Sequence, residues 1–126
     1  MVNLIIPLGA LNAFIAVAAG AFAAHGLKDA LSPAHLETFK TAADYQMLHG
    51  LGMILIGLLN RHGVTRSNNA SAIIMLIGIV LFSGSLYLLT LTGTRWLGMI
   101  TPIGGVCFLV AWLILGISHL TTTEQK

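Results

Sequence analysis

The chain has 126 residues, of which 56% are hydrophobic and 8% are charged, and its mean hydropathy is +0.90. Soluble domains carry roughly 25% charged residues, so this composition excludes a soluble globular protein. The net charge of +2 is too small to predict a nucleic-acid partner, and we expect the chain to lie in a lipid bilayer.

Four apolar stretches of the sequence are long enough to cross a membrane as helices. These stretches lie approximately at residues 4–24, 41–60, 70–91 and 96–119. A hydrocarbon core about 30 Å thick requires about 20 helical residues, and at this hydropathy only helices satisfy the backbone inside it. The sequence therefore predicts an all-α fold: a polytopic membrane protein in which residues 1–126 form one antiparallel bundle of four transmembrane helices.

The first stretch is expected to remain a packed helix rather than to be cleaved as a secretory signal. Residues 21–23 resemble the small residues of a cleavage site, but residues 1–11 contain no Lys or Arg. A face of small side chains also favours a packed helix, because it lets a neighbouring backbone approach closely. Its members are Asn12, Ala16, Ala19 and Ala23.

An amphipathic segment over residues 33–44 precedes the second stretch. Ser32 and Pro33 form a strong helix start, since serine caps free backbone N–H groups and proline fits the first helical position. The segment has one apolar stripe and two charged faces, a pattern typical of an element at a membrane surface. We expect a short interfacial helix between spans one and two that runs directly into span two.

Charge counting orients the bundle only weakly. Four spans place both termini and the loop over residues 60–69 on one side of the membrane. The basic residues divide evenly, with Arg61, Arg66 and Lys126 on that side and Lys28, Lys40 and Arg95 on the other. Acidic residues accompany the second group, so we expect the termini to lie inside the cell.

Polar side chains concentrate in one half of the predicted bundle. Antiparallel threading brings together the end of span one, the start of span two, the end of span three and the start of span four. The candidate binding residues in this half are His25, Tyr45, Gln46, His49, Ser83, Ser85, Tyr87 and Thr101. An imidazole or amide exposed to lipid loses its water without replacement. We therefore expect these groups to hydrogen-bond across the bundle or to line a wet cavity, with Tyr45 and His49 sharing one helix face.

Span four contains a proline and two glycines near its start. Pro102 lacks a backbone N–H and so frees the carbonyl of Gly98 from its helical partner. Gly104 and Gly105 let a partner helix approach closely or let the backbone flex.

Four ordered motifs resemble those of a known membrane family. They are Gly20-Ala-Phe-Ala-Ala-His-Gly26, Tyr45-Gln-Met-Leu-His-Gly50, Leu81-Phe-Ser-Gly-Ser-Leu-Tyr87 and Thr101-Pro-Ile-Gly-Gly105. Together they resemble domain-of-unknown-function family 423, the YgdD-like small bacterial membrane proteins, which is similar to eukaryotic transmembrane protein 256. The resemblance covers nearly the whole chain, with mild departures at Ala24 and Gly50. It implies a multi-pass protein of the bacterial plasma (inner) membrane and brings no established reaction, cofactor or substrate.

Three functions are compatible with this architecture. The first is a non-enzymatic accessory or structural membrane component, in which the polar residues tie the helices together. The second is an oligomeric carrier or channel for a small solute, ion or lipid, because ionisable groups inside a membrane are functional candidates. The third is a histidine-based metal or haem site, although no His-x-x-x-His or Cys-x-x-Cys pair occurs and Cys107 lies deep in span four.

We favour the first function and expect no enzymatic activity, no catalytic residue, no metal ligand and no cofactor. The expected partners are the lipid bilayer and either a second copy of the chain or another membrane protein. Self-association is expected because fourteen glycines suit close helix contacts and so small a bundle has much surface to share.

Overall fold

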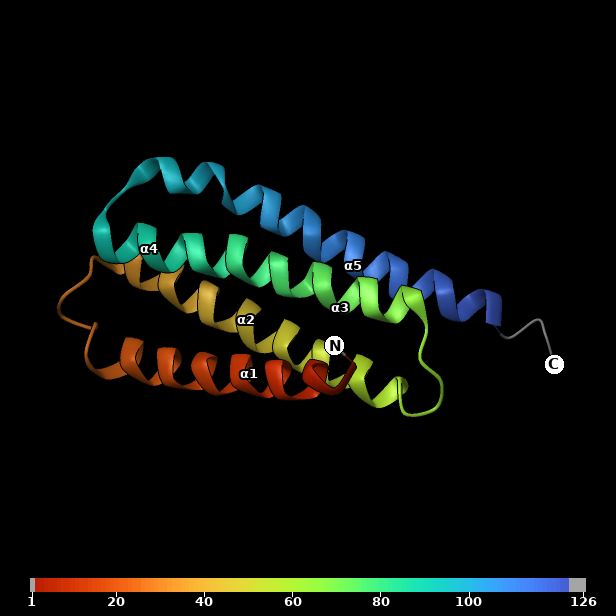
Figure 1. The fold of residues 1–126 in the computed structure, drawn as a ribbon. Helices are drawn as coiled ribbons and strands as arrows, with labels where there is room; N and C mark the ends of the chain where they lie inside the picture. Colours follow the sequence, from red (N-terminus) through yellow and green to blue (C-terminus); the bar gives the residue numbers. More distant parts are fainter. Residues whose placement is uncertain (1, 123–126) are drawn as a thin grey trace.

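The computed structural model describes residues 2–122, and no strand occurs among them (Figure 1). The elements in chain order are α1 (Val2–His25), α2 (Pro33–Leu59), α3 (Arg66–Ile79), the π-helix η1 (Val80–Gly84), α4 (Ser85–Thr92), the 3-10 helix η2 (Arg95–Met99) and α5 (Thr101–Thr122). They form four helical runs of 24, 27, 27 and 26 residues, each long and apolar enough to cross a membrane. The predicted all-α protein with four membrane-spanning helices is confirmed.

The second span is one continuous helix from the cap at Ser32 to Leu59. The Ser32 side chain accepts a hydrogen bond from the backbone N–H of His35 at 3.2 Å, and proline occupies the start of the helix, as expected. The segment over residues 33–44 is therefore the first part of α2. Its residue Phe39 is already buried, at 4% exposure, and packs against Leu27.

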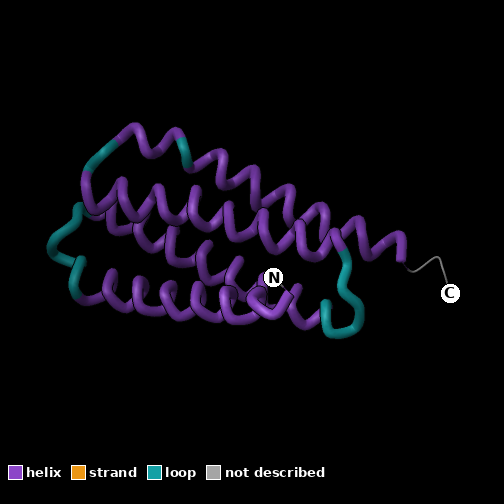
Figure 2. Tube along the Cα trace, viewed as in Figure 1, coloured by secondary structure: helices purple, strands orange, loops and turns teal. Residues whose placement is uncertain are grey.

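The third and fourth spans begin in different ways. Span three starts at Arg66, four residues before the expected boundary, because the Thr65 side chain caps it by accepting from the backbone N–H of Asn68 at 3.0 Å. Span four opens with the 3-10 turn η2 and becomes α-helical only at Thr101. Figure 2 shows loops at the two ends of the bundle and a short break between η2 and α5.

The bundle consists of two helix pairs, with α1 packed on α2 and α5 packed on α3 (Figure 1). Contacts of α2 with α3, η1 and α4 join the two pairs. The crossing of α1 and α2 is close, since a Cβ added to Gly9 would lie 2.6 Å from the carbonyl oxygen of Gly50. Because no real Cβ tolerates that distance, only glycine permits this crossing.

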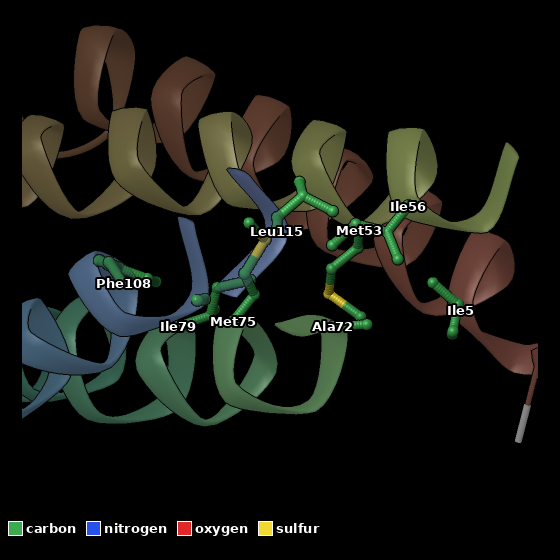
Figure 3. Packing of buried hydrophobic residues seen from close by; sticks show 9 residues of the cluster. Ile5, Met53, Ile56, Ala72, Met75, Ile79, Phe108 and Leu115 are labelled. Carbon is green, nitrogen blue, oxygen red and sulfur yellow. The ribbon is translucent and has the colours of Figure 1, made fainter. Parts of the chain in front are cut away.

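An apolar core fills the half of the bundle in which α1 begins and α2 ends, opposite the polar residues singled out in the sequence (Figure 3). Met53, Ile56 and Met75 are fully enclosed there, at 1%, 0% and 0% exposure. Phe108 marks the end of this core nearest the polar half. We call the half that holds the predicted candidate residues the polar half, although Asn60, Asn68 and Ser71 are buried in the opposite half.

Candidate functional site

Three polar side chains from three helices form one hydrogen-bonded chain. Gln46 Nε2 donates to Asn12 Oδ1 at 3.0 Å, and the Tyr87 hydroxyl donates to Gln46 Oε1 at 2.8 Å. Asn12 Nδ2 in turn donates to the carbonyl of Leu8 at 2.9 Å. A buried polar group left unpaired costs about 1–3 kcal/mol, so this chain links α1, α2 and α4 strongly.

A second set of hydroxyl bonds surrounds η1. Ser83 is fully buried, and its hydroxyl donates to the carbonyl oxygen of Ala42 in α2 at 2.7 Å. The Ser85 hydroxyl lies 2.9 Å from the carbonyl oxygen of Phe82 and 2.6 Å from the Thr101 hydroxyl, a contact in which either hydroxyl can donate. These bonds fasten the widened turn to both α2 and α5.

Gly104 allows α5 to lie directly on η1. A Cβ at this position would lie 2.4 Å from the backbone nitrogen of Phe82, far inside contact distance. The close helix approach expected at the glycine pair is thus present, and it occurs at the π-helical turn. Such turns recur at functional sites in other proteins because they redirect side chains.

His49 is 2% exposed, and both of its ring nitrogens have partners. Its Nδ1 lies 2.7 Å from the backbone carbonyl oxygen of Tyr45, and its Nε2 lies 3.1 Å from Nε1 of Trp112. A carbonyl only accepts and an indole N–H only donates, so these partners fix a neutral imidazole with its proton on Nδ1. A metal or haem iron would have to displace Trp112 to reach the lone pair on Nε2.

Aromatic rings around His49 line a groove of about 490 Å³ between α2, η1 and α5. The imidazole stacks on Phe108, with ring centroids 3.5 Å apart and planes inclined by 7°. We call this hollow the aromatic groove; its main lining residues are Tyr45, His49, Phe82, Gly105, Phe108 and Trp112.

The structure does not bring His25 to the other predicted residues, which corrects the expectation of one common cluster. It is the last residue of α1 and is exposed, and its side chain makes no hydrogen bond, ion pair or ring contact within residues 2–122. The reason is helical geometry. His25 lies about 200° around the helix from Ala23, which is buried on the face that packs against the bundle.

Six of the eight predicted residues form internal bonds, but in three separate sets. Gln46 and Tyr87 belong to the chain with Asn12, and Ser83, Ser85 and Thr101 surround η1, whereas His49 faces the aromatic groove. Tyr45 contributes its backbone carbonyl to His49. Its hydroxyl has no partner in the described part of the chain, and the residue is 42% exposed.

Sequence reasoning missed two groups of polar contacts. It gave no role to Trp112, the partner of His49, because a tryptophan in an apolar helix is expected to face lipid and carries no signal for a polar contact. It also gave no role to three asparagines at the end of α2 and the start of α3: Asn68 Nδ2 donates to Asn60 Oδ1 at 3.0 Å, and Asn60 Nδ2 donates to Asn69 Oδ1 at 3.1 Å. Their signal was the concentration of asparagine near residues 60–69.

The comparisons with known proteins identify the family. A family model described as a protein of unknown function, DUF423, matches residues 19–105, a range that contains all four motifs found in the sequence. The chain belongs to this family. The resemblance stated from the motifs is confirmed.

Relatives of this DUF423 member are small membrane proteins of similar length. A UPF0382 membrane protein of Staphylococcus epidermidis is 53% identical over 116 residues, which cover 91% of this chain and 93% of the relative. A Staphylococcus saprophyticus relative is 53% identical over 111 residues, covering 87% and 91%. The YwdK protein of Bacillus subtilis is 42% identical over 111 residues, covering 87% and 90%. No solved structure matches the chain.

These relatives are membrane proteins of Gram-positive bacteria. Together with the four apolar helices, they confirm the expected multi-pass location in the bacterial plasma membrane. The protein is accordingly in contact with the lipid bilayer.

Proposed function

We propose that this DUF423 protein is a non-enzymatic membrane component whose intramembrane polar residues hold the helices together. The observation that carries the proposal is the internal pairing of those residues. Bonds inside the protein occupy polar atoms of Gln46, His49, Ser83, Ser85, Tyr87 and Thr101. Interhelical bonds of this kind contribute about 0.6–2 kcal/mol each, enough to fix how four helices pack.

The same pairing argues against an enzyme and against a carrier or channel. A general acid or base must reach a proton on its substrate, but both nitrogens of His49 are already bonded within the protein. Ser83 is fully buried and donates to a backbone carbonyl, which is no arrangement for a nucleophile. A carrier or channel would need such groups to face a wet path instead of one another.

We further propose that the component works against another protein surface, with a second copy of the chain as the first candidate. The protein buries only 22% of the most apolar part of α1. It buries the same share of the span formed by η2 and α5, but 50% of that part of α2. These two outer helices offer broad apolar faces to a partner in the membrane.

The variant His49→Gln tests the proposal, because glutamine keeps one donor and one acceptor. The variant protein is expected to fold, and a strain that carries it should grow like its parent in direct competition. His62→Gln in the exposed loop is the matched control. A variant that folds with parental stability but loses the competition would contradict the proposal and assign His49 a chemical role.

A further inference from the structure

The aromatic groove has the size and lining of a small-molecule site. Its volume of about 490 Å³ falls in the range of about 300–1,000 Å³ typical of ligand pockets. Gly105 keeps it open, because a Cβ added there would meet only Cδ2 of Phe82, at 3.9 Å. A Cβ therefore fits at this position without a clash, and a longer side chain would extend into the groove.

The polar groups of the groove restrict its ligand. Both His49 nitrogens and the Trp112 N–H are bonded to each other or to the backbone. The Tyr45 hydroxyl remains as a hydrogen-bonding group without a partner within residues 2–122. The occupant must therefore be apolar along its length and carry an acceptor or donor at the end that meets Tyr45.

The position of Tyr45 along α2 sets the depth of that polar end. Asp44 is exposed and charged, so this level of α2 lies at the polar edge of the membrane. Side chains on a helix lean toward its N-terminus, which directs Tyr45 toward the same edge. From Pro102 to Trp112, α5 rises about 15 Å, so the groove runs from the interface toward the hydrocarbon.

We propose that the aromatic groove binds one bilayer phospholipid. An acyl chain lies along the rings of Phe82, Phe108 and Trp112, and a glycerol ester carbonyl accepts a hydrogen bond from the Tyr45 hydroxyl. A phospholipid fits because its ester groups lie at the interface and its chains descend into the hydrocarbon from there. This site goes beyond the proposed structural role, since a bundle held together internally does not need an individually bound lipid.

The fluorescence of Trp112 can report lipid binding in the groove directly. The chain contains two tryptophans, so the variant Trp96→Phe retains Trp112 as its single tryptophan. The detergent-solubilised Trp96→Phe protein is titrated with a phosphatidylcholine that carries a dibrominated stearoyl chain, since bromine quenches indole fluorescence on contact. We expect saturable quenching. Native mass spectrometry of the unmodified protein should show one retained phospholipid per chain.

Variants in the same Trp96→Phe background separate the groove from the general lipid surface. Gly105→Leu should raise the half-saturating lipid concentration at least about tenfold, because leucine occupies the space of the chain. Gly116→Leu is the matched control on the same helix, where an added Cβ meets no atom within 4 Å, and it should leave the titration unchanged. Tyr45→Phe should raise the half-saturating concentration about three- to tenfold, the effect of one hydrogen bond.

Circular dichroism checks that each variant is folded, and Gly105→Ala provides a smaller change at the same site if leucine disrupts packing. Quenching that grows without saturation and is equal in the Gly105 and Gly116 variants would overturn the proposal. So would a dibrominated alkane that binds as tightly as the phospholipid, because Tyr45 would then have no part. If the Gly105→Leu variant no longer self-associated but still bound the phospholipid, the proposal would also be overturned. The groove would then be an interface between copies of the chain.

Discussion

At the scale of single residues, the arrangement of His49 depends on Trp112 more than on any other side chain. Within residues 2–122 the indole N–H is the only donor to Nε2, and the imidazole stacks on the ring of Phe108. Removing the donor leaves an acceptor buried at 2% exposure without a partner. Leaving a buried polar atom without a partner destabilises the folded state by more than a typical hydrogen bond stabilises it.

We therefore expect Trp112→Phe to lower the free energy of unfolding by about 1–3 kcal/mol. Denaturant unfolding in detergent measures this change, and Trp96→Phe, at a site 61% exposed, serves as the control with little expected effect. Adding His49→Phe to Trp112→Phe removes the stranded acceptor and should restore part of the loss. A double variant that is less stable than the sum of its single changes would contradict this account.

The sequence predicted which polar residues lie in the polar half better than it predicted their partners. Gln46, His49 and Tyr87 were identified because amides, imidazoles and phenols inside a membrane must be paired. The pairing itself depends on helix rotation, which apolar sequences specify poorly. That dependence explains why His25 was included although it faces away, and why Trp112 was missed.

At the scale of the elements, glycines decide where helices meet. Gly104 and Gly105 are neighbours in α5 but differ sharply in their surroundings. An added Cβ would lie 2.4 Å from the Phe82 nitrogen at Gly104 and 3.9 Å from the nearest atom at Gly105. The adjacent pair therefore provides a matched test of the contact with η1.

Gly104→Ala is expected to destabilise the protein by about 1–3 kcal/mol, because either α5 or η1 must shift. Gly105→Ala should be neutral or slightly stabilising, since alanine favours helix by about 1 kcal/mol over glycine. Thermal unfolding in detergent compares the two. Equal melting temperatures would show that η1 and α5 do not contact each other through Gly104.

The crossing of α1 and α2 allows a second comparison of this kind. An added Cβ at Gly50 would lie 2.9 Å from the carbonyl of Gly9, whereas one at Gly20 would meet no atom within 4 Å. We expect Gly50→Ala to lower the unfolding free energy by about 1–3 kcal/mol and Gly20→Ala to leave it unchanged or raised. Denaturant unfolding measures both variants. A Gly20→Ala variant less stable than Gly50→Ala would contradict the observed crossing of α1 and α2.

The sequence predicted the number and type of the membrane-spanning elements, because about twenty apolar residues in a row have few other structures in lipid. The π-helical turn η1 was not predicted. Its residues Val80–Gly84 carry no local signal, and the extra residue is accommodated through contacts with distant parts of the chain, including Ala42 and Gly104.

At the scale of the whole molecule, four antiparallel spans place the two long connections on opposite sides of the membrane. The loop between α1 and α2 includes Ala30, and the loop between α2 and α3 includes Val64; both residues are exposed. In a Cys107→Ala background, single cysteines at these positions should react from opposite sides with a membrane-impermeant maleimide. With the termini inside, only Ala30→Cys is labelled on intact cells; labelling of both variants would contradict the four-span topology.

The central claim is that the intramembrane polar residues hold the bundle together instead of performing chemistry. It is tested most directly by a double-mutant cycle on Gln46 and Tyr87, with the unfolding free energy and competitive growth measured for Gln46→Leu, Tyr87→Phe and the double variant. The account predicts a coupling energy of about 0.6–2 kcal/mol, with growth falling only as stability falls. Variants that keep the parental unfolding free energy but lose growth would contradict it and make this chain of hydrogen bonds a functional site.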